Sequence, residues 1–271
     1  MPHFFVPPKN QKGLFFFFDK SESRHISRAL RKKSGELVSI FDGQGKVQKA
    51  KILDVSNPSK VTGEIVGNPP DSGSVSKPRR ILKIYPALIK GPRFEWMIEK
   101  LTEMGVSSIH PIVTERTIVR IRSEQSESKL KRWKKIVLAA SKQSGRSDIP
   151  AVFEPVSFDQ AVASDRALSE EVPHPWCYKG AAQNKETLGL MLWEGEENLT
   201  LSQALSKFAE TRPKTEGFSI RLFVGPEGGL AIPEAEKAKA NGILTVGLGQ
   251  NILRAETAAI ASAAVVLYQN D

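Results

Sequence analysis

Two glycine-rich loops near the end of the chain have the residue types of a small-molecule site. The first is Gly225-Pro-Glu-Gly-Gly229 and the second is Leu248-Gly-Gln-Asn-Ile-Leu253. Each follows a short run that contains β-branched residues, and each precedes a helical pattern. Because glycine leaves backbone N–H and C=O groups uncovered, two such loops side by side would bind a flat, polar molecule through the main chain. We expect Gly228 to hold a positive φ in the first loop.

Other interpretations of these loops are less specific. A dinucleotide-binding fingerprint fits Gly247-x-Gly249 but needs glycine or alanine at Ile252. A phosphate-binding loop would place Lys-Ser/Thr at the start of the next helix, and the first loop lacks that pair. Two ordinary strand-to-helix turns that need glycine stay open as an alternative. The reactive side chains that follow the second loop, at Arg254, Glu256 and Thr257, favour a binding site.

The two loops also carry motifs of a known family. Val224-Gly-Pro-Glu-Gly-Gly-Leu230, followed by Leu248-Gly-x-x-Ile-Leu-Arg-x-Glu-Thr-Ala258, resembles the ribosomal RNA small-subunit methyltransferase E family. Further matches occur in order at Pro86-Ala-Leu-Ile-Lys-Gly91, Glu95-Trp96, Lys100-Leu-Thr-Glu-Met-Gly105, Pro111-Ile-Val-Thr-Glu-Arg116, Gln143-Ser-Gly-Arg146 and Leu192-Trp-Glu194. The resemblance implies a SPOUT-superfamily enzyme that uses S-adenosylmethionine to methylate N3 of a uridine in 16S rRNA of the small ribosomal subunit.

This resemblance assigns roles to individual side chains. Cofactor contacts are expected from Leu192, Gly225, Pro226, Glu227, Gly228, Gly229, Leu248, Gly249, Ile252, Leu253 and Thr257. Uridine N3 keeps its proton at neutral pH, so the enzyme must remove that proton or stabilise the resulting negative charge. We expect Arg254 to stabilise the charge. Glu256 is the weaker candidate for taking the proton, and it could equally be a first-turn carboxylate that complements a helix dipole. Asn251 stands where the family usually has arginine.

The charge of the chain indicates an anionic partner. Lysine and arginine number 39 against 30 acidic residues, a formal net charge of +9, which favours nucleic acid over membrane. A charge that only keeps the protein soluble is an equally good explanation by itself. Candidate RNA contacts are Arg24, Arg28 and Arg31 in a predicted helix, and Arg116 and Arg146 in the family motifs. The lysine-rich stretch 129–135 is interpreted as a solvated helix face.

Several classes of site and location are not expected. The single cysteine, Cys177, excludes an internal disulfide and a cysteine-based zinc site. The four histidines show no metal-ligand spacing, so no metal is predicted. No apolar run approaches the roughly 20 residues of a membrane span, and the first residues lack a signal-peptide core. We therefore expect a cytoplasmic protein that does not bind membranes.

The hydrophobic pattern divides the chain at a linker rich in Pro, Gly and Ser, at 68–78. Residues 1–72 are expected to form a small closed β-barrel, with a helix at Ser23 to Arg31, and the resemblance makes this barrel PUA-like and RNA-binding. Residues 79–271 alternate strands and helices, which predicts a mostly parallel α/β sheet. The resemblance implies that this domain is trefoil-knotted. Expected strands begin near Phe4, Leu14, Leu37, Lys46, Lys60, Arg80, Val106, Val152, Leu188 and Ile220.

The last predicted helix, Glu256 to Tyr268, is apolar nearly all round. A helix that covers only one side should keep a polar face, so we predict a homodimer with this helix near its interface. Burial between the sheet and another helix of the same chain is a serious alternative. A second alternative concerns function: a non-catalytic RNA-binding ribosome assembly factor on the same fold, which the change to Asn251 keeps open.

Overall fold

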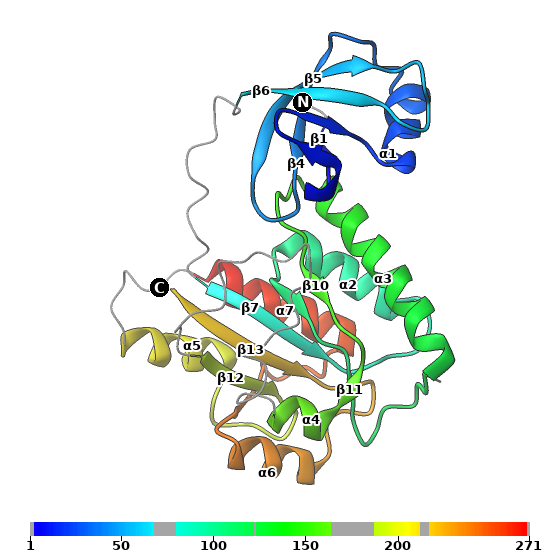
Figure 1. Ribbon diagram of the computed structural model, residues 1–271. Coiled ribbons are helices and arrows are strands. Elements are labelled where there is room, and N and C mark those ends of the chain that lie inside the picture. The colour runs from blue at the N-terminus through cyan, green and yellow to red at the C-terminus, as the bar shows by residue number, and fades with distance from the viewer. Residues whose placement is uncertain (1–2, 68–79, 122, 164–186, 212–216, 270–271) are drawn as a thin grey trace. The chain divides into compact units, whose positions relative to one another are not determined.

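The computed structural model describes residues 3–67, 80–121, 123–163, 187–211 and 217–269 (Figure 1). These residues form two compact units. The first contains the N-terminal strands together with Ser141–Ile149, and the second contains the other described residues. The predicted linker at 68–78 and Cys177 lie outside the described residues.

The N-terminal unit is built on one six-stranded sheet with the order β1-β4-β5-β6-β3-β2. Its strands are β1 (His3–Phe5), β2 (Gln11–Lys12), β3 (Phe15–Phe17), β4 (Leu37–Phe41), β5 (Val47–Asp54) and β6 (Thr62–Gly67). The predicted hairpin turn joins β4 to β5, and Gly43 and Gly45 hold the positive φ values that this turn needs. The strands predicted from this part of the sequence are therefore confirmed.

One helical segment closes the core of this unit. α1 (Lys20–Arg24) begins at Asp19, whose carboxylate accepts the Glu22 N–H at 2.8 Å. A π-helical turn, His25–Ala29, continues it and buries Ile26 among the inward side chains of the sheet. The predicted helix is thus present but begins earlier than expected, because Asp19 caps its start. It also ends before Arg31, which adopts a left-handed φ of 49°.

The Ser141–Ile149 segment packs against the N-terminal strands. Backbone bonds run from Gly45 N–H to Ser147 O at 3.0 Å and from Ile149 N–H to Gly43 O at 3.0 Å. The Lys142 ammonium donates to the buried Glu22 carboxylate. Burial raises the pKa of Glu22, and Lys142 opposes that shift. The segment that ends the long helix α3 (Ser123–Gln143) is therefore part of the first unit.

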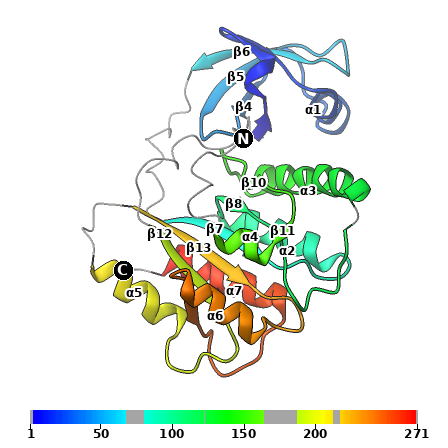
Figure 2. The ribbon, with the colours of Figure 1, turned by 60° about the horizontal axis from the view of Figure 1, so that its bottom comes forward.

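The second unit is a parallel sheet with the order β10-β8-β7-β13-β12-β14, which confirms the predicted α/β class. Its strands are β7 (Arg80–Pro86), β8 (Ser108–Ile109), β10 (Ala151–Val152), β12 (Thr187–Leu192), β13 (Phe218–Val224) and β14 (Leu244–Val246). All seven residues of β13 are buried. Helices α4 (Phe158–Ala163) and α6 (Ile232–Ala240) lie on one face, and α2 (Arg93–Met104) and α7 (Ala255–Tyr268) on the other (Figures 1 and 2).

The predicted strand from Val106 to Val113 is wrong as a single element. The chain forms β8, breaks at His110 and Pro111, and forms β9 (Ile112–Val113). Proline has no N–H for a ladder bond, which explains the break. β9 then pairs with β11 (Val156–Ser157), a strand too short for its pattern to stand out.

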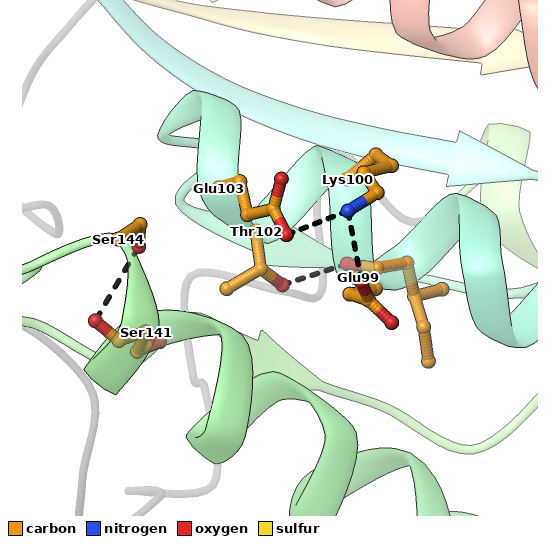
Figure 3. Close-up of polar contacts among 7 residues, drawn as sticks. Glu99, Lys100, Thr102, Glu103, Ser141 and Ser144 are labelled. Atoms are coloured by element: carbon orange, nitrogen blue, oxygen red, sulfur yellow. Dashed lines mark hydrogen bonds and ion pairs between the residues drawn. The ribbon is translucent and has the colours of Figure 1, made fainter.

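Helix α2 matches its prediction, with Pro92 before its first residue and Gly105 ending it at a φ of 104°. The Lys100 ammonium lies 2.8 Å from both Glu99 and Glu103 (Figure 3). The buried Thr102 hydroxyl donates to Ile98 O at 2.7 Å. Helix α5 (Leu201–Glu210) also matches, and a capping box of Thr200 and Gln203 fixes its start.

A buried histidine makes the stability of the second unit depend on pH. His110 stacks between Tyr85 and Phe153, and its Nε2 lies 2.8 Å from Ser108 Oγ. Burial, with smaller contributions from Lys83 and Arg221, lowers the pKa of His110 from 6.5 to about 3. Below pH 6.5 the unfolded chain therefore binds a proton that the folded chain does not bind until about pH 3.

We expect this single group to remove about 2 kcal/mol of stability between pH 7.5 and pH 5. Urea unfolding followed by tryptophan fluorescence measures the loss. The His110→Gln variant keeps a hydrogen-bonding group toward Ser108 but does not titrate, so its stability should change less with pH. The same pH dependence in both proteins would contradict this role of His110.

Candidate functional site: a cavity at the ends of three parallel strands

Three neighbouring strands place the two glycine loops side by side. β13 and β14 both pair in parallel with β12, so their carboxyl ends meet at one edge of the sheet. Ligand sites of open parallel sheets form at this edge. The first loop follows β13, the second follows β14, and Trp193 and Glu194 follow β12.

The loops line a cavity of about 130 Å³ that is open to solvent on one side. Eight of the predicted cofactor residues line it: Leu192, Gly225, Pro226, Gly229, Leu248, Gly249, Ile252 and Leu253. Within the described residues, the structure therefore brings these eight predicted positions together around one cavity.

Further lining residues were not predicted. They are Trp193, Glu194, Glu196, Val224, Val246, Gly247, Gln250, Asn251, Ala255 and Ala258. Leu230, the last residue of the first family motif, also lines the cavity. A usable signal for Trp193 and Glu194 was their place directly after Leu192, at the carboxyl end of a buried strand.

Two acidic side chains give one wall of the cavity its charge. The Glu194 carboxylate lies 3.5 Å from the position that a Cβ would take on Gly229. Glu196 accepts the Thr245 hydroxyl at 2.5 Å, which holds the pKa of its carboxyl below the usual range. Both groups can therefore accept hydrogen bonds from ligand hydroxyl or ammonium groups.

The middle of the first loop faces away from the cavity. Glu227 and Gly228 do not line it. Glu227 accepts the Arg93 guanidinium at 2.6 Å and the Lys90 N–H at 3.3 Å. Gly228 O accepts Arg116 Nη1 at 2.9 Å. These contacts brace the loop from outside.

The expected positive φ belongs to a different glycine. Gly229 has a φ of 69°, whereas Gly228 is not in the left-handed region. A Cβ on Gly228 would meet the Arg116 side chain at 3.4 Å and no cavity atom. The predicted positive φ of Gly228 is therefore wrong, because the turn into Leu230 is made one residue later.

The two candidate catalytic residues have different surroundings. Arg254 is exposed at the start of α7, directly after the lining residue Leu253, and within the described residues its guanidinium has no ion pair. Glu256 is only 6% exposed and does not line the cavity. Its Oε1 lies 3.7 Å from Arg93 Nη1, and its Oε2 has no hydrogen bond among the described residues. Thr257 is exposed and also outside the lining.

Arg93 contacts an acid in the first glycine loop and an acid in the helix that follows the second loop. Its guanidinium contacts Glu227 after β13 and Glu256 in the first turn of α7. An acid in the first turn complements the helix dipole. The position of Glu256 therefore fits the helix-start interpretation better than that of a proton acceptor facing the cavity.

The predicted RNA-binding arginines occupy three settings. All three of Arg24, Arg28 and Arg31 are exposed: Arg24 lies on α1, Arg28 on the π-helical turn, and Arg31 just after that turn. Arg116 is exposed and bonded to the first loop. Arg146 lies in the first unit and pairs with Asp148 at 2.6 Å.

Comparisons with known proteins agree with this geometry. A family model described as an RNA methyltransferase domain matches residues 76–267, and an RNA methyltransferase PUA domain matches 18–66. A Synechocystis protein named ribosomal RNA small subunit methyltransferase E is 31% identical over 88% of this chain and 68% of its own. The chain belongs to the ribosomal RNA small-subunit methyltransferase E family.

Other members support the same assignment. A Bacillus subtilis protein of that name is 28% identical over 94% of this chain and 91% of its own. The crystal structure of the Neisseria gonorrhoeae enzyme of this family bound to S-adenosyl methionine has a TM-score of 0.74 and 25% identity, over 98% of this chain and 96% of that chain. A putative Legionella pneumophila methyltransferase with bound cofactor has a TM-score of 0.74 and 27% identity, with the same coverage.

Two further properties concern the described residues alone. No group of three or more His, Cys, Asp or Glu side chains among them could hold a metal ion. Among these same residues, no helix has the length and apolar character to span a membrane.

Proposed function

We propose that this chain methylates N3 of one uridine in the 16S rRNA of the small ribosomal subunit, in the cytoplasm. Membership of the family establishes that the chain is an S-adenosylmethionine-dependent methyltransferase of small-subunit ribosomal RNA. The observation that carries the proposal is the cavity, because its walls come from two glycine loops whose sequences match family motifs.

The loops hold the donor chiefly through backbone groups. S-adenosylmethionine supplies an electrophilic methyl group when it is bound. In our proposal, backbone groups of Gly225, Gly229 and Gly249 bond its polar edges, and Ile252 and Leu253 pack on its adenine ring. Ile252 is 82% exposed, so it is available for this contact. Positioning of donor and acceptor supplies most of the rate of such a transfer.

The acceptor needs help to lose its proton. The N3 lone pair forms the new N–C bond, the S–C bond breaks, and the N3 proton leaves to solvent or a base. We assign to Arg254 the stabilisation of the negative charge that develops on the uracil ring. The support is its exposed, unpaired guanidinium beside the cavity lining, within the part of the chain that the structure describes.

We also propose the trefoil knot that the SPOUT resemblance implies. The strand order supports it: β14, the last strand in sequence, lies beyond β12, while α7 returns to contact β7 and α2. The chain must therefore travel back across the sheet after the second loop.

We further propose a homodimer with α7 near its interface. Ala259, Ala263 and Val266 are buried within the chain, as the intrachain alternative requires. Other apolar side chains of α7 are only half-buried, among them Ile260, Ala261, Ala264, Val265 and Leu267. Light scattering should give the mass of two 29.9-kDa chains. Ala264→Glu should split the dimer, because it places a charge in the contact; a monomeric mass for the wild-type protein at micromolar concentration would rule the dimer out.

Methyl transfer in vitro tests the function directly. The protein is incubated with methyl-tritiated S-adenosylmethionine and small subunits from a strain that lacks the enzyme, and the rRNA is digested to nucleosides. We expect the label in 3-methyluridine and none with large subunits. Label in another nucleoside would exclude N3 of uridine. Binding of subunits without any transfer would favour the non-catalytic assembly factor.

A further inference from the structure

An exposed aromatic pair lies on the sheet of the N-terminal unit. In β3, Phe15 is 57% exposed and Phe17 37% exposed, whereas Phe16 between them is buried at 4%. Phe16 is fixed inside, because its ring lies 2.4 Å from where a Cβ of Gly63 would be. Since side chains alternate along a strand, Phe15 and Phe17 must both face outward.

Basic side chains surround this pair on the same face. The strand register aligns Lys12, Phe15, Glu64, Lys51 and Leu37 in one row across five strands. Directly opposed residues of antiparallel strands project on the same side of a sheet. The Lys60 ammonium lies 5.2 Å from the centre of the Phe17 ring. The acids of this face are Glu64 and Asp54, and Asp54 is bonded to Ser56.

We propose that Phe15 and Phe17 form a base-stacking platform for single-stranded RNA, with Lys12, Lys51 and Lys60 contacting its phosphates. The inference rests on the proposed function for the class of partner and names a surface for it. Two residues along a strand span about 7 Å, which suits two successive splayed bases. Aromatic rings on an open sheet face, combined with lysines, are how proteins bind single-stranded RNA without reading its sequence.

This platform is distinct from the predicted arginine surface. Arg24 and Arg28 belong to the helical segment that buries Ile26 in the core on the inner side of the sheet, and Arg31 follows that segment. The aromatic pair is on the outer side of the same sheet. The N-terminal unit would therefore contact RNA on two sides of its sheet. The arginine surface alone would contact RNA on one side only.

The test uses the full-length protein and a fluorescein-labelled 12-nucleotide oligouridylate in fluorescence anisotropy. Replacing both Phe15 and Phe17 by Ala should weaken binding roughly 10- to 100-fold, from the loss of base stacking. The variant with Tyr at both positions should keep wild-type affinity for the oligonucleotide. The variant with Leu at both positions should bind it as weakly as the variant with Ala at both. The salt dependence should be unchanged in these variants, whereas Lys51→Ala should lower its log–log slope by about 0.7. Ile232→Ala, an exposed apolar position on α6, is the matched control.

Each outcome decides the proposal. Wild-type affinity in the Leu protein would mean that the face is an apolar protein-docking surface. Unchanged affinity in the variant with Ala at both positions, or no binding by the wild-type protein, would contradict the proposed platform. Methyl transfer to small subunits, measured in parallel with the same proteins, keeps the two claims separate. Transfer by a wild-type protein that does not bind the oligonucleotide would overturn the platform alone, and absence of transfer would overturn the proposed function alone.

Discussion

Gly229→Val should weaken S-adenosylmethionine binding while the protein stays folded. Gly229 has a φ of 69° in the cavity wall, and a Cβ there would point at the Glu194 carboxylate 3.5 Å away. A branched side chain strains this conformation by roughly 1–2 kcal/mol. It would also displace the backbone groups that, in our proposal, bond the ligand. Loss of two main-chain hydrogen bonds, each about 1 kcal/mol, lowers affinity by about 30-fold.

A second glycine with a positive φ serves as a control for the backbone strain that valine introduces at Gly229. Gly242 has a φ of 76° in the turn after α6, with open space around it, and does not line the cavity. Gly242→Val should cost similar stability but leave the affinity for S-adenosylmethionine unchanged. Calorimetry on both variants, with melting temperatures, makes the comparison. Equal affinities for the two variants would exclude the first loop from the cofactor site.

Arg254→Ala should lower kcat for small-subunit methylation by about 10²–10³-fold, with the affinity for S-adenosylmethionine nearly unchanged. Removal of one group that stabilises a developing negative charge has effects of this size. Arg254→Lys should recover part of the rate, since it restores the charge but not the planar guanidinium. Single-turnover transfer measures the rate, and calorimetry measures the affinity.

The pH dependence of the same reaction tests the assigned role. Higher pH ionises uridine N3 without assistance, so the gap between wild type and Arg254→Ala should narrow as the pH rises. A constant gap would mean that Arg254 only positions RNA. Glu256→Gln gives the complementary comparison: a loss of kcat as large as that of Arg254→Ala would identify Glu256 as the proton acceptor, against the buried, Arg93-paired position described here.

The local elements of this fold were predictable because their signals are local. Helix α2 has an apolar stripe between Pro92 and Gly105, and each of these signals acts within a few residues. The split of the predicted Val106–Val113 strand was missed, since β9 depends on β11, more than 40 residues later. A two-residue strand has no period of its own. Its pairing is decided by tertiary contacts rather than propensity.

The candidate site also combines features with a local sequence signal and features that depend on residues far apart in the sequence. The glycine spacing predicted the loops, and eight of their predicted contacts line one cavity. Spacing did not reveal that Glu227 and Gly228 face Arg93 and Arg116, because those partners lie more than 100 residues earlier. The expected positive φ was therefore assigned to the wrong member of the glycine pair, Gly228 instead of Gly229.

Primer extension across 16S rRNA tests the central claim most directly. A methyl group on N3 blocks the Watson–Crick edge of uridine and stops reverse transcriptase at that residue. We predict that deletion of the gene removes one stop, that the wild-type gene restores it, and that the Arg254→Ala gene restores it weakly or not at all. An unchanged pattern of stops in the deletion strain would contradict methylation of uridine N3 by this protein.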